Sequence, residues 1–133
     1  MRFSAVENVE DGGVVLEEML KVAKWYEEAG ADILNVSQGW FTETVPAYCW
    51  PEALNIEYAA AVKKVVDVPV FCAGRITSPE MAEKFIADGL IDFVAIGRGQ
   101  LADPDYVTKV MEGRTDEIVR CIACDQGCIE RLY

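Results

Sequence analysis

Three cysteines near the end of the sequence have the spacing of metal ligands. Cys121, Cys124 and Cys128 form the pattern C-x2-C-x3-C within "CIACDQGC". A tetrahedral metal site needs a fourth ligand. The two remaining cysteines are not obvious candidates, because Cys72 falls in an apolar run that suits a small core residue and Cys49 falls in an aromatic stretch. The pattern predicts three ligands of a metal site and leaves the fourth open.

Two glycine–arginine pairs carry the second chemical signal. They occur in "AGRI" (residues 73–76) and "IGRG" (residues 96–99), each at the end of an apolar run. Glycine lets the backbone come close to a ligand, and the following arginine adds positive charge. Two such turns on neighbouring parallel strands suit a phosphate group. From these residues alone, a phosphate site and two tight turns whose arginines pair with surface acids both stay open.

The composition excludes several other kinds of chemistry. The 133 residues include no histidine, which excludes Ser-His-Asp and Cys-His catalysis within this chain. Lys and Arg number 12 against 23 Asp and Glu, so we expect no binding to nucleic acid or to anionic membranes. No stretch reaches the roughly 20 apolar residues of a membrane span, and the first residues lack the pattern of a signal peptide. The composition therefore indicates a cytoplasmic globular protein with reduced cysteines.

Four strand–helix units are predicted to position these groups. The expected strands are residues 2–6, 32–37, 68–74 and 92–97, and the expected helices are residues 14–29, 56–66, 79–88 and 103–113. Alternating strands and helices predict a parallel sheet with right-handed crossovers. Four such units make half of a (β/α)8 barrel or a small open sheet.

The order of these signals resembles that of a known family. "VPVFCAGRITSPE", "IGRGQLADP" and "CIACDQGC" look like the C-terminal half of the barrel of the old yellow enzyme family of NADH:flavin oxidoreductases. The resemblance is closest to the iron–sulfur branch, which includes 2,4-dienoyl-CoA reductase and the enoate reductases. It implies an α/β fold, with half of an FMN-binding TIM barrel in residues 1–115. Residues 116–133 would then begin a segment that binds a [4Fe–4S] cluster.

The resemblance also implies roles for individual residues. The FMN phosphate would be held by Ala73, Gly74, Arg75, Gly97 and Arg98. Arg2 matches an arginine that faces the flavin ring, where a cation stabilises the negative charge of the reduced cofactor. Taken by itself, Arg2 is a solvated residue near the chain terminus. Cys121, Cys124 and Cys128 would be the first three cluster ligands, since thiolates are the ligands of iron–sulfur clusters.

The sequence departs from the family in its aromatic stretch. Dienoyl-CoA reductase-like relatives carry Gly-Trp-His-Glu, whose histidine assists proton transfer, whereas this chain has "GWFTET". Phe41 takes the histidine position and cannot transfer a proton. Trp40 and Phe41 are predicted to line a substrate pocket, with hydrophobic packing of a long loop as the alternative.

Three functional hypotheses follow. The first is a piece of a longer FMN- and [4Fe–4S]-dependent enzyme that uses NAD(P)H to reduce an activated C=C bond. We expect this piece to lack the fourth cluster ligand, four preceding βα units and any catalytic residue. We therefore expect it to be inactive alone. The second is a non-catalytic half-barrel that forms a homodimer to cover its open strand edges. The third is a phosphate-binding barrel whose three thiolates hold zinc.

Overall fold

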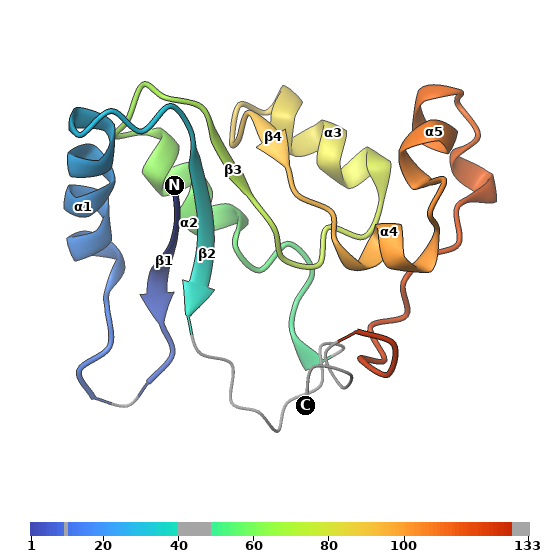
Figure 1. Cartoon of the computed structure of the whole chain (residues 1–133), viewed down its shortest axis with the longest axis horizontal. Helices are drawn as coiled ribbons and strands as arrows, with labels where there is room; N and C mark the ends of the chain where they lie inside the picture. The colour runs from blue at the N-terminus through green and yellow to red at the C-terminus, as the bar shows by residue number, and fades with distance from the viewer. Residues whose placement is uncertain (10, 40–48, 129–133) are drawn as a thin grey trace.

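The computed structural model describes residues 1–9, 11–39 and 49–128, which form a single parallel sheet with helices (Figure 1). The strands, in the order in which they pair, are β1 (Arg2–Glu7), β2 (Leu34–Gly39), β3 (Val70–Cys72) and β4 (Phe93–Val94). The helices are α1 (Leu16–Glu28), α2 (Ile56–Lys63), α3 (Pro79–Ala87), α4 (Arg98–Ala102) and α5 (Tyr106–Met111), followed by the 3-10 helix η2 (Thr115–Glu117). Every neighbouring pair of strands is parallel, which confirms the predicted run of four βα units. None of the described helices has the length and apolar character needed to cross a bilayer.

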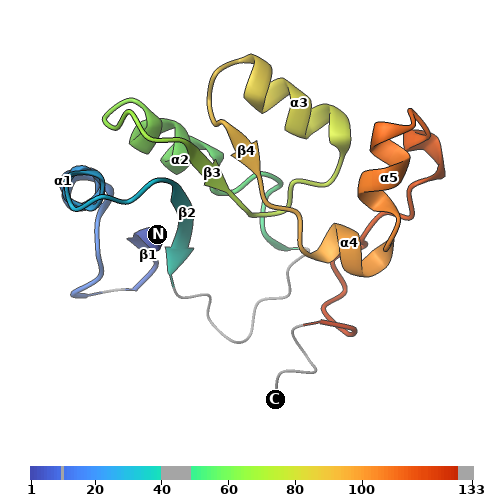
Figure 2. The same cartoon turned by 45° about the horizontal axis from the view of Figure 1, so that its top comes forward.

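One face of the sheet is covered by helices. Figure 2 shows α1, α2 and α3 along the same side of the strands. A row of aligned residues on this side runs across all four strands and comprises Phe3, Val36, Cys72 and Val94. These side chains form the core with apolar residues of the three helices, and the ring of Phe3 lies 5.5 Å from that of Tyr26 in α1. Burial of each large apolar side chain contributes roughly 1.5–3 kcal/mol, so this layer holds the helices on the sheet.

The opposite face carries a second row, which comprises Arg2, Asn35, Phe71 and Phe93. Successive side chains of a strand point to opposite faces, so this row points away from the helices. Phe93 is 53% exposed there. In a complete barrel this face is the packed interior.

The segment after β4 differs from its prediction. The sequence favours one helix over residues 103–113, but the structure contains two, α4 and α5, which are separated by residues 103–105. The residue before a proline avoids the helical region, and Asp103 has φ −138° and ψ 100°. The predicted helix therefore begins three residues later, and a short additional helix begins directly at Arg98.

Candidate functional site

A cavity of about 320 Å³ lies at the end of the sheet where β3 and β4 finish. Its wall includes all six residues that the sequence analysis assigns to FMN: Arg2, Ala73, Gly74, Arg75, Gly97 and Arg98. Arg2 belongs to the same wall because its side chain reaches Ser37 of β2, with 3.3 Å between Nη2 and Oγ. The fold thus brings together residues that are up to 96 positions apart in sequence. The predicted pocket residues Trp40 and Phe41 lie outside the described residues.

The wall of this cavity has a strongly positive composition. Four of the six arginines in the sequence line it: Arg2, Arg75, Arg98 and Arg120. None of the described residues that line it is an aspartate or a glutamate, although the sequence holds 23 of them. A concave site lined by cations and enclosed by apolar walls attracts anions.

The first glycine–arginine turn is conformationally demanding. Gly74 has φ +136°, and a Cβ placed on it would lie 2.6 Å from Leu54 Cδ2 and 2.9 Å from Asn55 Nδ2. Arg75 follows in the left-handed region with φ 51°. Only glycine tolerates both the dihedral angle and the contact at position 74. The sequence signal "AGR" therefore marks a backbone that packs closely against α2 and the residues before it.

The second glycine–arginine turn faces open space. A Cβ on Gly97 would have no atom within 4 Å, and Gly97 lies in the cavity wall. This leaves the backbone at residue 97 accessible to a bound group. The two turns therefore have different roles: one is fixed by packing, and the other is open.

Two of the arginines are held by partners from other segments. The Arg75 guanidinium donates to the Trp50 carbonyl. Arg98 Nη1 lies 3.4 Å from Asp125 Oδ1, a long ion pair with the cysteine segment. A bound anion at this wall would compete with Asp125 for Arg98.

Two buried polar atoms in the wall test whether the site fits a ligand. Asn55 and Tyr106 are each 4% exposed, and neither Asn55 Oδ1 nor the Tyr106 hydroxyl has a hydrogen-bond partner among the described residues. Burial raises the pKa of Tyr106, so its hydroxyl keeps its proton at neutral pH. Buried groups of this kind are normally satisfied by a ligand or by water. Cations, open backbone and unsatisfied polar atoms together fit a group such as FMN, which carries a phosphate and several hydroxyls.

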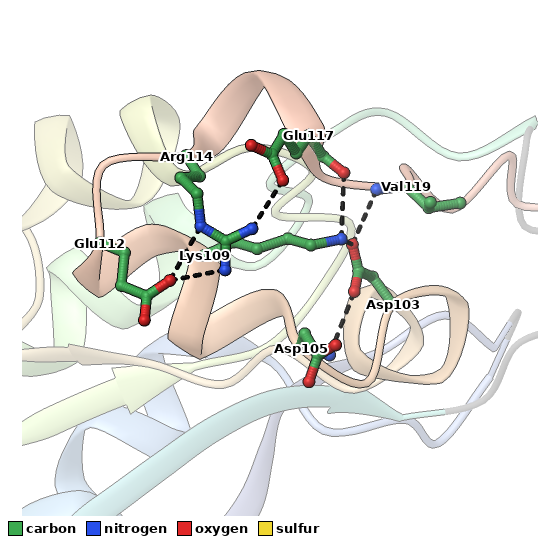
Figure 3. Close-up of polar contacts among 7 residues, drawn as sticks. All are labelled: Asp103, Asp105, Lys109, Glu112, Arg114, Glu117 and Val119. Carbon is green, nitrogen blue, oxygen red and sulfur yellow. Dashed lines mark hydrogen bonds and ion pairs between the residues drawn. The ribbon is translucent and has the colours of Figure 1, made fainter.

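Asp103 anchors the chain that leads to the cysteines. It is 3% exposed and accepts hydrogen bonds from Lys109 Nζ (2.7 Å) and Val119 N (2.9 Å), while Lys109 also donates to the Glu117 carbonyl (Figure 3). The bond from Lys109 holds the pKa of Asp103 below its usual value. This network fixes the residue before Arg120, and so it places Arg120 and Cys121 in the cavity wall.

The three predicted metal ligands do not form a metal site as they stand. Cys121 and Cys128 are half-buried, and Cys124 is exposed. The Cys121 sulfur accepts from Ala123 N, and the Cys128 thiol lies 3.6 Å from the Asp125 carbonyl. Within residues 1–9, 11–39 and 49–128, no three His, Cys, Asp or Glu side chains are gathered around a common point. The donor type suits iron–sulfur chemistry, but the arrangement does not match a cluster.

The other two cysteines are separate from the site. Cys72 is buried in β3, where burial raises the pKa of its thiol to about 11. Such a thiol is unreactive at neutral pH, in line with a core position. Cys49 is an exposed free thiol.

Sequence reasoning missed several residues of the cavity wall, among them the polar residues Asn55, Tyr106 and Arg120. Asn55 and Tyr106 occupy ordinary positions at the starts of α2 and α5, and no local pattern marks them. Arg120 directly precedes Cys121, so its proximity to the cysteine pattern was the only available signal.

Comparison with known proteins gives a consistent picture. Residues 1–117 match the profile of the NADH:flavin oxidoreductase / NADH oxidase family. The chain is 48% identical to the NADH oxidase of Thermoanaerobacter brockii over 132 residues, covering 96% of this chain and 20% of that protein. It is 36% identical to the cinnamate reductase of Clostridium sporogenes, covering 95% of this chain and 19% of that protein.

Solved structures agree with the sequence matches. A 2-naphthoyl-CoA reductase complex superposes with a TM-score of 0.86 at 33% identity, covering 96% of this chain and 20% of that one. The histamine dehydrogenase of Rhizobium sp. 4-9 superposes with a TM-score of 0.84 at 26% identity, covering 96% and 18%. The predicted half of a TIM barrel is thus confirmed, and the chain spans about one fifth of the length of these relatives.

Proposed function

The chain belongs to the NADH:flavin oxidoreductase / NADH oxidase family, and from that premise we propose that it supplies the phosphate-binding half of the FMN site in a reductase of activated C=C bonds. The observation that carries this proposal is the cavity at the strand ends, which is lined by four arginines and by no acidic residue among those described. Relatives named cinnamate reductase and 2-naphthoyl-CoA reductase support the choice of substrate class, because both names refer to conjugated acyl compounds.

Each element of the wall has a specific task in this proposal. The backbone at Gly74 and Gly97, together with Arg75 and Arg98, binds the phosphate, while Ala73 continues the turn. Arg2 lies on the sheet face opposite the helices and would stabilise negative charge on the flavin ring. A bound flavin would supply the hydride chemistry that links NAD(P)H to the substrate. The described residues include no histidine and no other group that we assign as the proton donor.

Cys121, Cys124 and Cys128 are proposed as three ligands of a [4Fe–4S] cluster. Their thiols are the correct donor type, and Cys121 lies in the wall of the flavin cavity. In this structure the three thiols are not gathered around a common point. Anaerobic reconstitution with iron and sulfide, followed by metal analysis, distinguishes this proposal from a zinc site: iron and acid-labile sulfide support it, and zinc alone contradicts it.

A second candidate is a non-catalytic module that pairs with another copy. It is favoured by one observation: among the described residues, β1 and β4 each pair on one edge alone, and Phe93 of β4 is exposed. In this case the anion cavity is retained, but no reduction follows.

Titration of the anaerobic chain with FMN tests the main proposal. We expect saturable quenching of flavin fluorescence with one FMN per chain. Arg98→Gln removes one cation from the wall and is expected to weaken binding by about tenfold, since a charged hydrogen bond contributes about 1.5–3 kcal/mol. Lys64→Gln is the matched control, because Lys64 lies at the end of α2 and does not line the cavity. Equal affinities of the two variants would contradict the proposed site.

A further inference from the structure

The segment at residues 50–55 is joined to the turn at residues 73–77 by several contacts. Leu54 and Asn55 of this segment also pack under Gly74. The hydrogen bonds run from Ala53 N to the Arg75 carbonyl (3.1 Å), from Asn55 Nδ2 to the Ala73 carbonyl (2.6 Å), from Thr77 Oγ1 to Glu52 Oε1 (2.9 Å), and from the Arg75 guanidinium to the Trp50 carbonyl. The conformation of the predicted phosphate turn is therefore set from outside the turn itself.

Asn55 makes the most buried of these contacts. The residue is 4% exposed, and its carboxamide nitrogen donates to the Ala73 carbonyl across 18 positions of sequence. The same nitrogen lies 2.9 Å from the position of a Cβ on residue 74. Glycine at 74 and asparagine at 55 are thus a matched pair, in which the missing side chain of one makes room for the amide of the other.

The bond to Ala73 determines where the next N–H points. In a trans peptide the carbonyl oxygen and the following N–H point in opposite directions, and the chain has no cis peptide bond among its described residues. Because Asn55 holds the Ala73 carbonyl, the Gly74 N–H is directed to the side of the peptide away from Asn55. Gly74 is one of the residues that line the arginine-rich cavity.

A second observation points to a bound molecule at the same side chain. Asn55 Oδ1 is buried in the cavity wall and has no hydrogen-bond donor among the described residues. Leaving such an acceptor unsatisfied is costly, so a ligand hydroxyl or a water molecule is expected to satisfy it.

We propose that Asn55 is a positioning residue of the anion site, whose carboxamide orients the Ala73–Gly74 peptide so that the Gly74 N–H donates to the phosphate of the bound flavin. This inference rests on the proposed function. Asn55 would act indirectly, through the Ala73–Gly74 turn, whereas the arginines would contact the anion directly.

Comparison of FMN with riboflavin isolates this role. The two molecules share the ring and the hydroxylated chain, and they differ by the phosphate, so the ratio of their dissociation constants reports on the phosphate site. For Asn55→Ala we expect FMN affinity to fall about tenfold and riboflavin affinity to change less than about threefold. A general loss of packing would weaken both ligands equally and leave the ratio unchanged.

A second variant keeps the shape of the side chain. Asn55→Asp replaces the donating nitrogen with a charged oxygen that repels both the Ala73 carbonyl and a phosphate. We therefore expect the ratio of the FMN dissociation constant to the riboflavin dissociation constant to rise further than in Asn55→Ala. Asn8→Ala serves as the control, since Asn8 is an exposed asparagine that does not line the cavity. These variants remain informative if Asn55→Ala fails to fold.

The outcomes separate the inference from its premise. Wild-type protein that binds neither flavin overturns the proposed function, and the inference with it. Wild-type protein that prefers FMN, together with Asn55 variants that keep that preference, overturns the inference alone. A preference that is lost in both Asn55 variants and kept in Asn8→Ala supports it.

Discussion

Gly74 and Gly97 follow the ends of the neighbouring strands β3 and β4, yet their surroundings differ. Gly74 has φ +136° and would place a Cβ against Leu54 and Asn55, whereas a Cβ at Gly97 meets nothing within 4 Å. Gly74→Ala is therefore expected to lower the free energy of unfolding by about 1–3 kcal/mol, because only glycine populates that backbone region without strain. Urea denaturation followed by circular dichroism measures the change.

Gly97→Ala is the matched control for stability. It is expected to unfold at the wild-type urea concentration, and at the same time to bind FMN more weakly, because its methyl group occupies space at the open wall. A Gly74→Ala protein as stable as the wild type would show that the turn does not have the described conformation.

The sequence predicts those site residues that neighbouring residues mark, and it misses those that only distant contacts bring to the site. The glycine–arginine pairs were recognisable because each directly follows an apolar strand. Their position at the end of the sheet can therefore be predicted from neighbouring residues in the sequence. Asn55 and Tyr106 acquire their roles through contacts with residues far away in sequence, and an isolated asparagine or tyrosine has no local signature. The six predicted flavin residues meet at one cavity, but their binding of FMN stays a prediction.

The α4–α5 segment depends on a single buried carboxylate. Asp103 accepts from Lys109 and from the backbone at Val119, and these bonds hold its pKa below its usual value. A group with a lowered folded-state pKa adds stability above its unfolded pKa of about 3.9, and this stability is lost as the pH falls through the folded value. Asp103→Asn is therefore expected to melt several degrees lower than wild type at pH 7, and the difference is expected to shrink below about pH 4.

Thermal melts of both proteins between pH 3 and pH 8 measure this effect. Glu112→Gln is the control, since Glu112 forms an exposed ion pair with Arg114 and such pairs contribute little. A difference between Asp103→Asn and wild type that is constant with pH would show that the carboxylate is not charged in this network.

Element boundaries were predicted less well than element types. All four strands and the first three helices appear in the predicted order, because apolar periodicity and the Ser78 cap, whose Oγ accepts from Met81 N, are local signals. The strands β3 and β4 are shorter than expected. The length of a strand depends on which residues of the adjacent strand pair with it, and the sequence does not show that pairing. Helix α4 was not predicted, and the helix expected to begin at Asp103 begins instead at Tyr106, after Pro104.

The whole molecule presents an open sheet. In the described part, β1 and β4 have no partner on their outer edges, and the row that contains Phe93 faces away from the helices. Parallel strands are normally covered on both faces. We expect the isolated chain to associate, with light scattering after gel filtration giving twice the 14.7 kDa chain mass.

Phe93→Lys tests whether this open face mediates the association. A charge at Phe93, on the sheet face opposite the helices, is expected to shift the protein towards monomer. Trp25→Lys on the exposed side of α1 is expected to leave the mass unchanged. A wild-type chain that is folded and monomeric at all concentrations would contradict this expectation.

We propose above that this half-barrel carries an anion site that binds flavin phosphate. The most direct measurement is the visible absorbance of the anaerobically purified chain after incubation with FMN and gel filtration. We expect flavin bands to remain with the protein at about one FMN per chain. A folded but colourless protein would contradict it.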